Sequence, residues 1–263
     1  MRNKLKNIKR VVLSTVDYNP RKFAYKIKAL AVWNEDFKEL KKQGLGDDNF
    51  NLDTLYPFLE DKKDSSGTAT GHYFHQDLYV ARLIYENCPQ QHIDIGSRID
   101  GFVAHVAVFR EIEVIDIRPI ENKVKNIKFK QMDFMLLPKT MYKAYQSISS
   151  LHAIEHFGLG RYGDPINFYG HIKAIDNIAL MLKEGGVFYF SVPIGPQRIE
   201  FNAHRIFSLG YIINILKKNF EIENFSYVDD QGGFFEDCML TKDKIVNNFG
   251  CNHGCGIFTC IKK

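Results

Sequence analysis

The chain has 263 residues, of which 45% are apolar and 25% are charged. This length fits one large domain or one domain with an extension, and the composition excludes collagen-like, low-complexity and wholly disordered proteins. No apolar run approaches the ~18 residues of a membrane-spanning helix, and the five cysteines lack the spacing of a disulfide framework. We therefore expect a globular protein with reduced thiols and no transmembrane segment.

The net charge of +4 hides a basic N-terminus. Residues 1–30 hold nine Lys and Arg against one acid, which leaves the rest of the chain at a net charge of −4. The apolar stretch of a signal peptide does not follow these charges, so we expect a cytoplasmic protein. The basic segment could bind an anionic surface or form a solvated face, and the sequence leaves both interpretations open.

The first part of the chain has a helical pattern. Apolar residues recur at spacings of three and four between Phe23 and Leu40, and the polar segment 61–71 is typical of a loop. We therefore expect a helical extension over residues 1–71 and a second domain over residues 72–263. The extension is expected either to cover the active site or to form a homodimer interface.

From residue 91 onward, short apolar runs alternate with longer helical stretches. We expect strands at 92–95, 113–117, 127–132, 147–151, 186–192, 220–228 and 256–261. Helices are expected at 78–85, 101–109, 172–182 and 211–218. This rhythm gives right-handed crossovers and a mostly parallel sheet covered on both faces. The expected fold is α/β and Rossmann-like, with a seven-stranded sheet flanked by helices.

A glycine-containing turn, Asp94-Ile95-Gly96-Ser97-Arg98-Ile99-Asp100-Gly101, joins the first strand of this sheet to the next helix. In a doubly wound sheet, glycines at this place let backbone amides approach a nucleotide-type ligand. Asp116 ends the second strand, where a carboxylate can bind both hydroxyls of a ribose, and Asp133 follows the third strand. A pyrophosphate cofactor is disfavoured, because Arg98 stands where a second glycine would be needed.

The turn resembles a relaxed form of motif I of the class I S-adenosylmethionine (SAM) methyltransferases. The resemblance covers about residues 72–263 and implies their fold, with SAM as the cofactor. It also implies that Asp94 lies near the methionine end of SAM and that Asp116 binds the ribose. The cofactor-binding residues that it implies are Asp94, Gly96, Ser97, Arg98, Gly101, Asp116 and Asp133.

A second motif, His152, Glu155 and His156, follows the fourth strand. If a helical turn begins at His152, the three side chains share one face, where they could either contact SAM or hold a cation. Together with the later segment 200–204, the motif resembles the small-RNA 2′-O-methyltransferases, which bind Mg²⁺. That resemblance implies His152, Glu155, His156 and His204 as metal ligands, the first three also being catalytic. With so many imidazoles, Mn²⁺, Fe²⁺ or Zn²⁺ suits the set better than Mg²⁺.

The loop 160–165 supplies Arg161, suited to a phosphate, and Tyr162, suited to stacking on a base or sugar. With the segment 201–205, the motifs resemble a methyltransferase family of bacterial surface-polysaccharide gene clusters, and more narrowly the capsule heptose O-methyltransferases. This resemblance implies O-methylation of a sugar or sugar nucleotide, with Arg161, Tyr162 and Asn202 binding the substrate. One alternative is an RNA 2′-O-methyltransferase, disfavoured by the net negative charge after residue 30, and another is a SAM-binding module without activity.

The C-terminal segment Cys251-Asn252-His253-Gly254-Cys255, with Cys260 nearby, contains residue types that bind zinc. Its spacing fits no common zinc finger, and it runs into a strand-like stretch. We therefore expect a strand here and no metal site.

Overall fold

The computed structural model describes residues 20–263 except 45–49, 51, 53–54, 60 and 122. Most of the basic N-terminal segment lies outside these residues, so its predicted role stays a prediction. The chain divides into two compact units, Met1–Thr68 and Ala69–Lys263. Among the described residues, no helix has both the length and the apolar character needed to cross a membrane.

The first unit contains the predicted helix, α2 (Pro20–Gln43), and a short 3₁₀ helix, η1 (Asp61–Lys63). Trp33 and Phe37 lie one turn apart on α2 and stack, with ring centroids 5.7 Å apart. Ile27 and Leu30 on the same helix are exposed. The N-terminal helix that the apolar spacing predicted is therefore confirmed.

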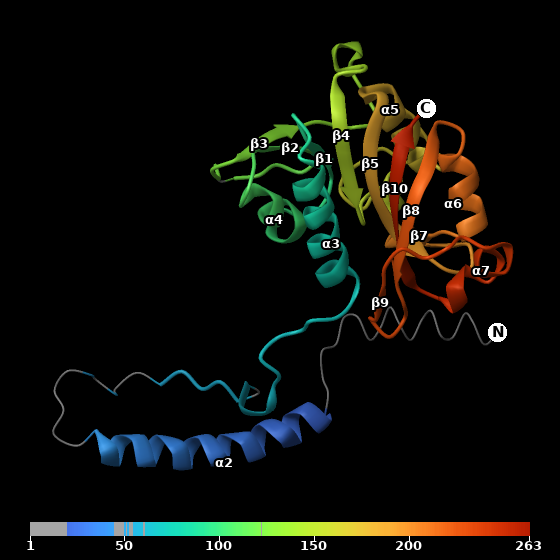
Figure 1. Ribbon diagram of the computed structural model, residues 1–263. Helices are drawn as coiled ribbons and strands as arrows, with labels where there is room; N and C mark the ends of the chain where they lie inside the picture. The colour runs from blue at the N-terminus through green and yellow to red at the C-terminus, as the bar shows by residue number, and fades with distance from the viewer. Residues whose placement is uncertain (1–19, 45–49, 51, 53–54, 60, 122) are drawn as a thin grey trace. The chain divides into compact units, whose positions relative to one another are not determined.

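The second unit is built on an eight-stranded sheet with the order β3-β2-β1-β4-β5-β10-β8-β9 (Figure 1). The strands are β1 (Ile93–Ile95), β2 (Ile112–Asp116), β3 (Ile127–Gln131), β4 (Tyr145–Leu151), β5 (Leu182–Ile194), β8 (Phe220–Val228), β9 (Phe234–Phe235) and β10 (Gly254–Lys262). The first five strands in this order pair in parallel, and the remaining pairs are antiparallel. Because the chain order reverses between β1 and β4, their carboxyl ends form the edge where such folds bind ligands.

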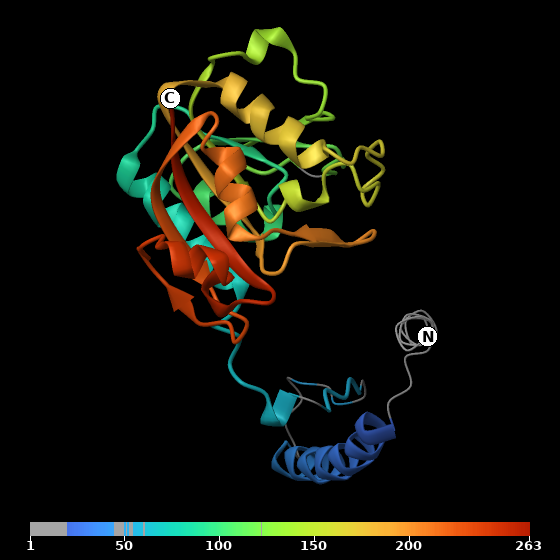
Figure 2. The ribbon, with the colours of Figure 1, turned by 90° about the vertical axis from the view of Figure 1, so that its right-hand side faces the viewer.

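Helices cover both faces of the sheet (Figures 1 and 2), and an apolar layer packs between the sheet and the helices on each face. One layer packs around α3 (His72–Asn87), the π-helical turn η2 (Ile99–Val103) and α4 (Ala104–Ala107). The other contains α5 (Gly170–Met181) and α6 (Leu209–Leu216). Burial on both faces explains why the strands have apolar runs rather than strict alternation. The Rossmann-like sheet is confirmed.

Four details differ from the sequence-based expectation. The sheet has eight strands instead of seven, because β9 is a two-residue strand, too short to leave a periodic pattern. The helix expected at 101–109 begins at Ile99 with the π-helical turn η2. A separate hairpin of β6 (Arg198–Glu200) and β7 (His204–Ile206) follows β5, and α7 (Lys242–Val246) lies before β10.

Candidate functional site

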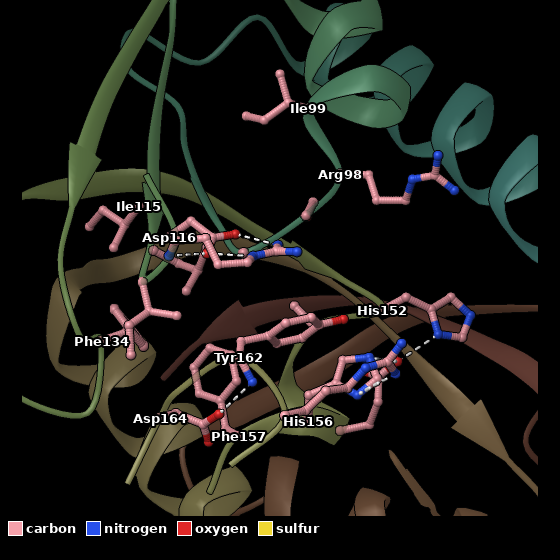
Figure 3. A pocket seen from close by; sticks show the side chains of 18 of the residues that line it. Arg98, Ile99, Ile115, Asp116, Phe134, His152, His156, Phe157, Tyr162 and Asp164 are labelled. Carbon is pink, nitrogen blue, oxygen red and sulfur yellow. Dashed lines mark hydrogen bonds and ion pairs between the residues drawn. The ribbon is translucent and has the colours of Figure 1, made fainter. Parts of the chain in front are cut away.

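A cavity of about 790 Å³ lies at the carboxyl ends of the parallel strands (Figure 3). Its walls come from the segments that follow β1, β2, β3 and β4, within residues 95–100, 115–120, 132–135 and 152–164. His72, Tyr73, Phe129, Pro193, His204 and His253 complete the lining. The cavity thus occupies the reversal in strand order, the usual ligand position in a doubly wound fold.

Asp94 holds the loop after β1 from behind and does not line the cavity. It is fully buried, and its carboxylate accepts hydrogen bonds from Ser97 N (2.9 Å), Ser97 Oγ (2.6 Å) and Ser149 Oγ (2.5 Å). Burial raises the pKa of Asp94 to about 7. Ser97 Oγ in turn accepts a hydrogen bond from Leu151 N at 2.9 Å. Asp94 therefore ties the loop after β1 to the end of β4.

The two glycines of this loop have different roles. Gly96 lines the cavity with φ of +74°, and a Cβ there would lie 3.1 Å from Ala153 Cβ, so both conformation and space favour glycine. Gly101 does not line the cavity, and a Cβ on it would lie 2.5 Å from Asp77 Oδ2. Gly101 therefore permits close packing of η2 on α3. Arg98, paired with the exposed Asp100 at 2.8 Å, stands at the rim.

The predicted ribose-binding carboxylate, Asp116, lies at the end of β2 on the cavity wall. Its Oδ1 accepts hydrogen bonds from Arg118 N (2.8 Å) and Nε (3.0 Å), and its Oδ2 accepts one from Nη2 (2.6 Å). Oδ1 thus accepts two hydrogen bonds and Oδ2 one, so Oδ2 keeps further acceptor capacity. Asp133, also on the wall, accepts a hydrogen bond from Met135 N at 2.9 Å.

Tyr162 and Arg161 also line the cavity, and Tyr162 is linked to Asp116 through Arg118 (Figure 3). The guanidinium of Arg118 lies 4.3 Å from the Tyr162 ring centroid, and that of Arg161 lies 5.1 Å from it. Arg161 also donates a hydrogen bond to Ala203 O at 2.9 Å. Asn202 is exposed in the turn between β6 and β7 and does not line the cavity. The structure thus brings Arg161 and Tyr162, but not Asn202, to the cavity.

His152, Glu155 and His156 all line the cavity, although they do not share one helical face as expected. The 3₁₀ helix η4 covers only Ile154–His156, and His152 precedes it with a positive φ of 48°. This conformation directs His152 Nδ1 to Glu155 Oε1 at 2.7 Å, and both side chains are almost fully buried. His156 Nδ1 donates to Ala203 O at 2.7 Å, which leaves His156 Nε2 with a free lone pair.

Three buried polar atoms around this pair have no hydrogen-bond partner: His152 Nε2, Glu155 Oε2 and His204 Nε2. His204 Nε2 lies 3.5 Å from Glu200 Oε2, at ion-pair distance. Burial alone would lower the pKa of His152, but Cys255 and Glu155 hold it well above its ordinary value. Burial alone would raise the pKa of Glu155, but His152 and His156 hold it low. The pair is therefore built to carry opposite charges.

The predicted metal ligands surround the cavity without converging on one point. His156 Nε2 lies 3.8 Å from Glu155 Oε1, and the rings of His156 and His204 are 6.3 Å apart. Among the described residues, the only three donors whose ligand atoms all lie within 4.8 Å of one another belong to His72, His152 and Cys255. The predicted ligand set stays a prediction.

Two cavity histidines, His72 and His253, had no assigned role in the sequence analysis. The ring of His72 stacks on that of His152, with centroids 5.2 Å apart, and His253 stacks on His204 at the same distance. Burial, with His152 and His253 nearby, lowers the pKa of His72 to about 4. The sequence signal for His253 and Cys255 is the cysteine- and histidine-containing segment 251–255. Its spacing fits no common zinc finger, so it did not predict a place at the cavity.

Residues 104–244 match the family described as Caenorhabditis protein of unknown function, DUF268. The match spans more than half of the chain. The chain belongs to the DUF268 family. Among curated proteins, none matches its sequence.

The DUF268 match includes Asp116, Asp133, the segment 152–162 and His204, but not the loop after β1. It also stops short of His253 and Cys255. The DUF268 region therefore contains most of the predicted metal- and substrate-binding residues that line the cavity, and segments outside it complete the walls.

Solved structures show the fold of this DUF268 protein. It is similar to Burkholderia thailandensis 1,6-didemethyltoxoflavin-N1-methyltransferase, crystallised with S-adenosylhomocysteine, at 13% identity and a TM-score of 0.50, covering 94% of this chain and 93% of that one. A putative sarcosine dimethylglycine methyltransferase from Galdieria sulphuraria gives 15% identity, a TM-score of 0.50 and coverage of 71% and 85%. The [4+2]-cyclase SpnF has 13% identity and a TM-score of 0.50, covering 75% of this chain and 85% of that one. The protein has the Rossmann-like methyltransferase fold, which by itself does not assign an activity.

Proposed function

We propose that the protein is a SAM-dependent O-methyltransferase that, with the help of a divalent metal, methylates a hydroxyl of a sugar or sugar nucleotide. The observation that carries the proposal is the composition of one cavity. The loop after β1 and Asp116 form one wall, and the buried Glu155–His152 pair, His156 and His204 lie across from them. A methyl donor and an acceptor need such adjoining places for in-line transfer.

The donor side of the cavity has the features that SAM requires. Gly96 brings the backbone close to the ligand, Asp94 fixes the loop, and Asp116 offers carboxylate oxygens to the ribose hydroxyls. SAM supplies a methyl group on a sulfonium, which an oxygen nucleophile attacks. The S-adenosylhomocysteine bound by the Burkholderia neighbour supports SAM as the cofactor.

The acceptor side carries positive charge and an aromatic face. Arg161 and Arg118 flank the Tyr162 ring at the cavity wall. Guanidinium groups suit the phosphates of a nucleotide-linked sugar, and an aromatic face suits a sugar ring or a base. This arrangement supports a sugar nucleotide, such as a heptose-type precursor of a surface polysaccharide.

The donor set supports a divalent metal, Mn²⁺, Fe²⁺, Zn²⁺ or Mg²⁺, on the acceptor side. Glu155 Oε2 and His204 Nε2 are buried without a hydrogen-bond partner, although His204 Nε2 lies 3.5 Å from Glu200 Oε2. His156 Nε2 has a free lone pair because Nδ1 donates to Ala203 O. When bound, such a metal orients two neighbouring hydroxyls and lowers the pKa of one. In this proposal the hydrogen bond from His152 orients Glu155. The imidazole of His156 accepts the hydroxyl proton when the metal leaves its Nε2 free.

The test is mass spectrometry of matched acceptors after incubation with SAM. We expect a methyl group on a sugar nucleotide with adjacent hydroxyls, and turnover lower by orders of magnitude when the neighbouring hydroxyl is removed. Glu155→Gln should reduce the transfer, whereas Glu184→Gln, an exposed control far from the cavity, should not. Methylation of RNA, of an amine, or of the deoxy sugar at an equal rate contradicts the proposal.

A further inference from the structure

Three metal-binding side chains converge at one end of the cavity. One nitrogen each of His72 and His152 and the Sγ of Cys255 all lie within 4.8 Å of one another. The three residues come from three different segments: His72 begins α3, His152 follows β4, and Cys255 lies in β10. We propose that His72, His152 and Cys255 hold a soft divalent cation, Zn²⁺ above all, at a position separate from His156 and His204.

The hydrogen bond to Glu155 orients His152 as a metal ligand. Its Nδ1 donates to Glu155 Oε1 at 2.7 Å, which directs Nε2 away from the carboxylate. His152 Nε2 is buried and has no hydrogen-bond partner, and only 4% of the side chain is exposed. A carboxylate that holds one imidazole nitrogen while the other binds a metal is the usual outer support of a zinc-binding histidine. Glu155 is thus a positioning residue for this site.

The other two donors complete a compact set. The His72 ring is nearly parallel to that of His152, at 3° with centroids 5.2 Å apart, and Cys255 is fully buried. The long Sγ contacts of Cys255, 3.5 Å to Gln76 Oε1 and 4.0 Å to Gly256 O, are weak hydrogen bonds. The thiol therefore has no strong partner that would compete with a cation.

The chemistry of the donors selects the cation. One thiolate with two imidazoles favours Zn²⁺ over the hard cations Mg²⁺ and Ca²⁺. His72 and His152 line the cavity, whereas Cys255 lies behind its wall. Three protein ligands with a fourth position toward the cavity are the pattern of a zinc site that binds a further oxygen or nitrogen ligand.

The experiment uses the full chain, stripped of metal with a chelator and titrated with Co²⁺ as a spectroscopic substitute for Zn²⁺. We expect a near-ultraviolet thiolate-to-cobalt charge-transfer band from one Co²⁺ per chain. Co²⁺ at the proposed acceptor-side ligands, which include no sulfur, adds nothing to this band. Cys255→Ser should abolish the band, and His72→Ala should weaken Zn²⁺ binding by more than about tenfold. Cys251→Ser, which removes another buried thiol outside the group, should leave the band unchanged. His204→Ala should also retain it, which separates this site from the proposed ligands of the acceptor side.

A second measurement does not depend on how the variants fold. X-ray absorption of the Zn²⁺-loaded wild-type chain should show one sulfur and at least two imidazole nitrogens around the metal. A first shell without sulfur, or with two or more sulfurs, overturns the proposal. So do failure of Zn²⁺ to bind and a charge-transfer band that survives Cys255→Ser. Calorimetry of SAM binding, run beside these titrations, reports on the proposed function separately.

Discussion

Glu155 Oε1 accepts a hydrogen bond from His152 Nδ1 at 2.7 Å, and the two side chains are 2% and 4% exposed. A carboxylate and an imidazole buried this completely stabilise each other as an ion pair, since each alone would carry a large desolvation cost. Glu155 Oε2 and His152 Nε2 stay without partners on either side of this bond. The pair therefore has two atoms open to a further ligand: Glu155 Oε2, and His152 Nε2 once a cation displaces the proton that the imidazolium carries there.

We predict that Asp116→Ala weakens SAM binding by more than about tenfold, because a charge-assisted contact of roughly 1.5–3 kcal/mol is lost. Isothermal titration calorimetry measures the affinity. Glu111→Ala is the control, because Glu111 is exposed just before β2 and pairs with Lys128 at 2.7 Å. Unchanged SAM affinity in a folded Asp116→Ala protein would remove Asp116 from the cofactor site.

The double variant Glu155→Ala/His204→Ala is expected to lose the acceptor-side metal. It should keep its affinity for SAM, because the proposed metal site and the proposed SAM site are built from different loops. Electron paramagnetic resonance of added Mn²⁺ follows the metal, and calorimetry follows SAM. Exposed Glu184 provides a control for the loss of a carboxylate. Stoichiometric Mn²⁺ in the double variant, or full activity after exhaustive chelation, contradicts the predicted ligands.

Arg205 fixes the backbone that carries the histidines. It is 3% exposed and donates to Glu155 O (3.2 Å), Phe157 O (2.7 Å) and Phe168 O (3.0 Å). We predict that Arg205→Met lowers the free energy of unfolding by at least about 2 kcal/mol, because these buried carbonyls lose a charged donor. Denaturant unfolding measures it. Arg82→Met removes exposed ion pairs with Glu236 and Glu86 and a contact with the Tyr79 ring. It should change stability by less than about 1 kcal/mol, and equal effects of the two substitutions would contradict this role of Arg205.

Stability should fall in acid partly because of His92. Its ring is fully buried between Ser147 Oγ (2.7 Å) and Ser149 Oγ (3.0 Å), and burial lowers its pKa from 6.5 to about 3. Between these values the unfolded chain binds a proton that the folded chain excludes, so the free energy of unfolding decreases as pH falls, by up to ~1.4 kcal/mol per pH unit. Below a pH of about 3 the folded and the unfolded chain both bind the proton, so His92 no longer makes the free energy of unfolding depend on pH.

The measurement is the pH dependence of urea unfolding for wild type and His92→Gln. Gln keeps a donor and an acceptor but does not titrate, so its curve should be flatter across this interval. His105→Gln changes an exposed histidine and should reproduce the wild-type slope. Parallel curves for wild type and His92→Gln would contradict a neutral buried His92.

The sequence by itself determined the strands, the helices and the edge of the sheet at which the cavity lies. Buried parallel strands leave continuous apolar runs, and helices leave a period near 3.6, so β1 to β5 and their helices could be predicted from local pattern. The turn at Gly96 and the carboxylate at Asp116 were equally readable, because they follow strands whose ends meet at one edge. The two-residue β9 was missed, since two residues carry no period.

Only the tertiary structure decided which potential metal-binding side chains lie close together. His152 left the expected helical face because a positive φ of 48° turns it toward Glu155. His72 and Cys255 are 183 positions apart in the chain, and they converge on His152 through the packing of α3 and the place of β10 beside β5. Strand order and helix packing depend on contacts across the whole sheet, and these contacts leave no mark on the spacing of the residues that they bring together.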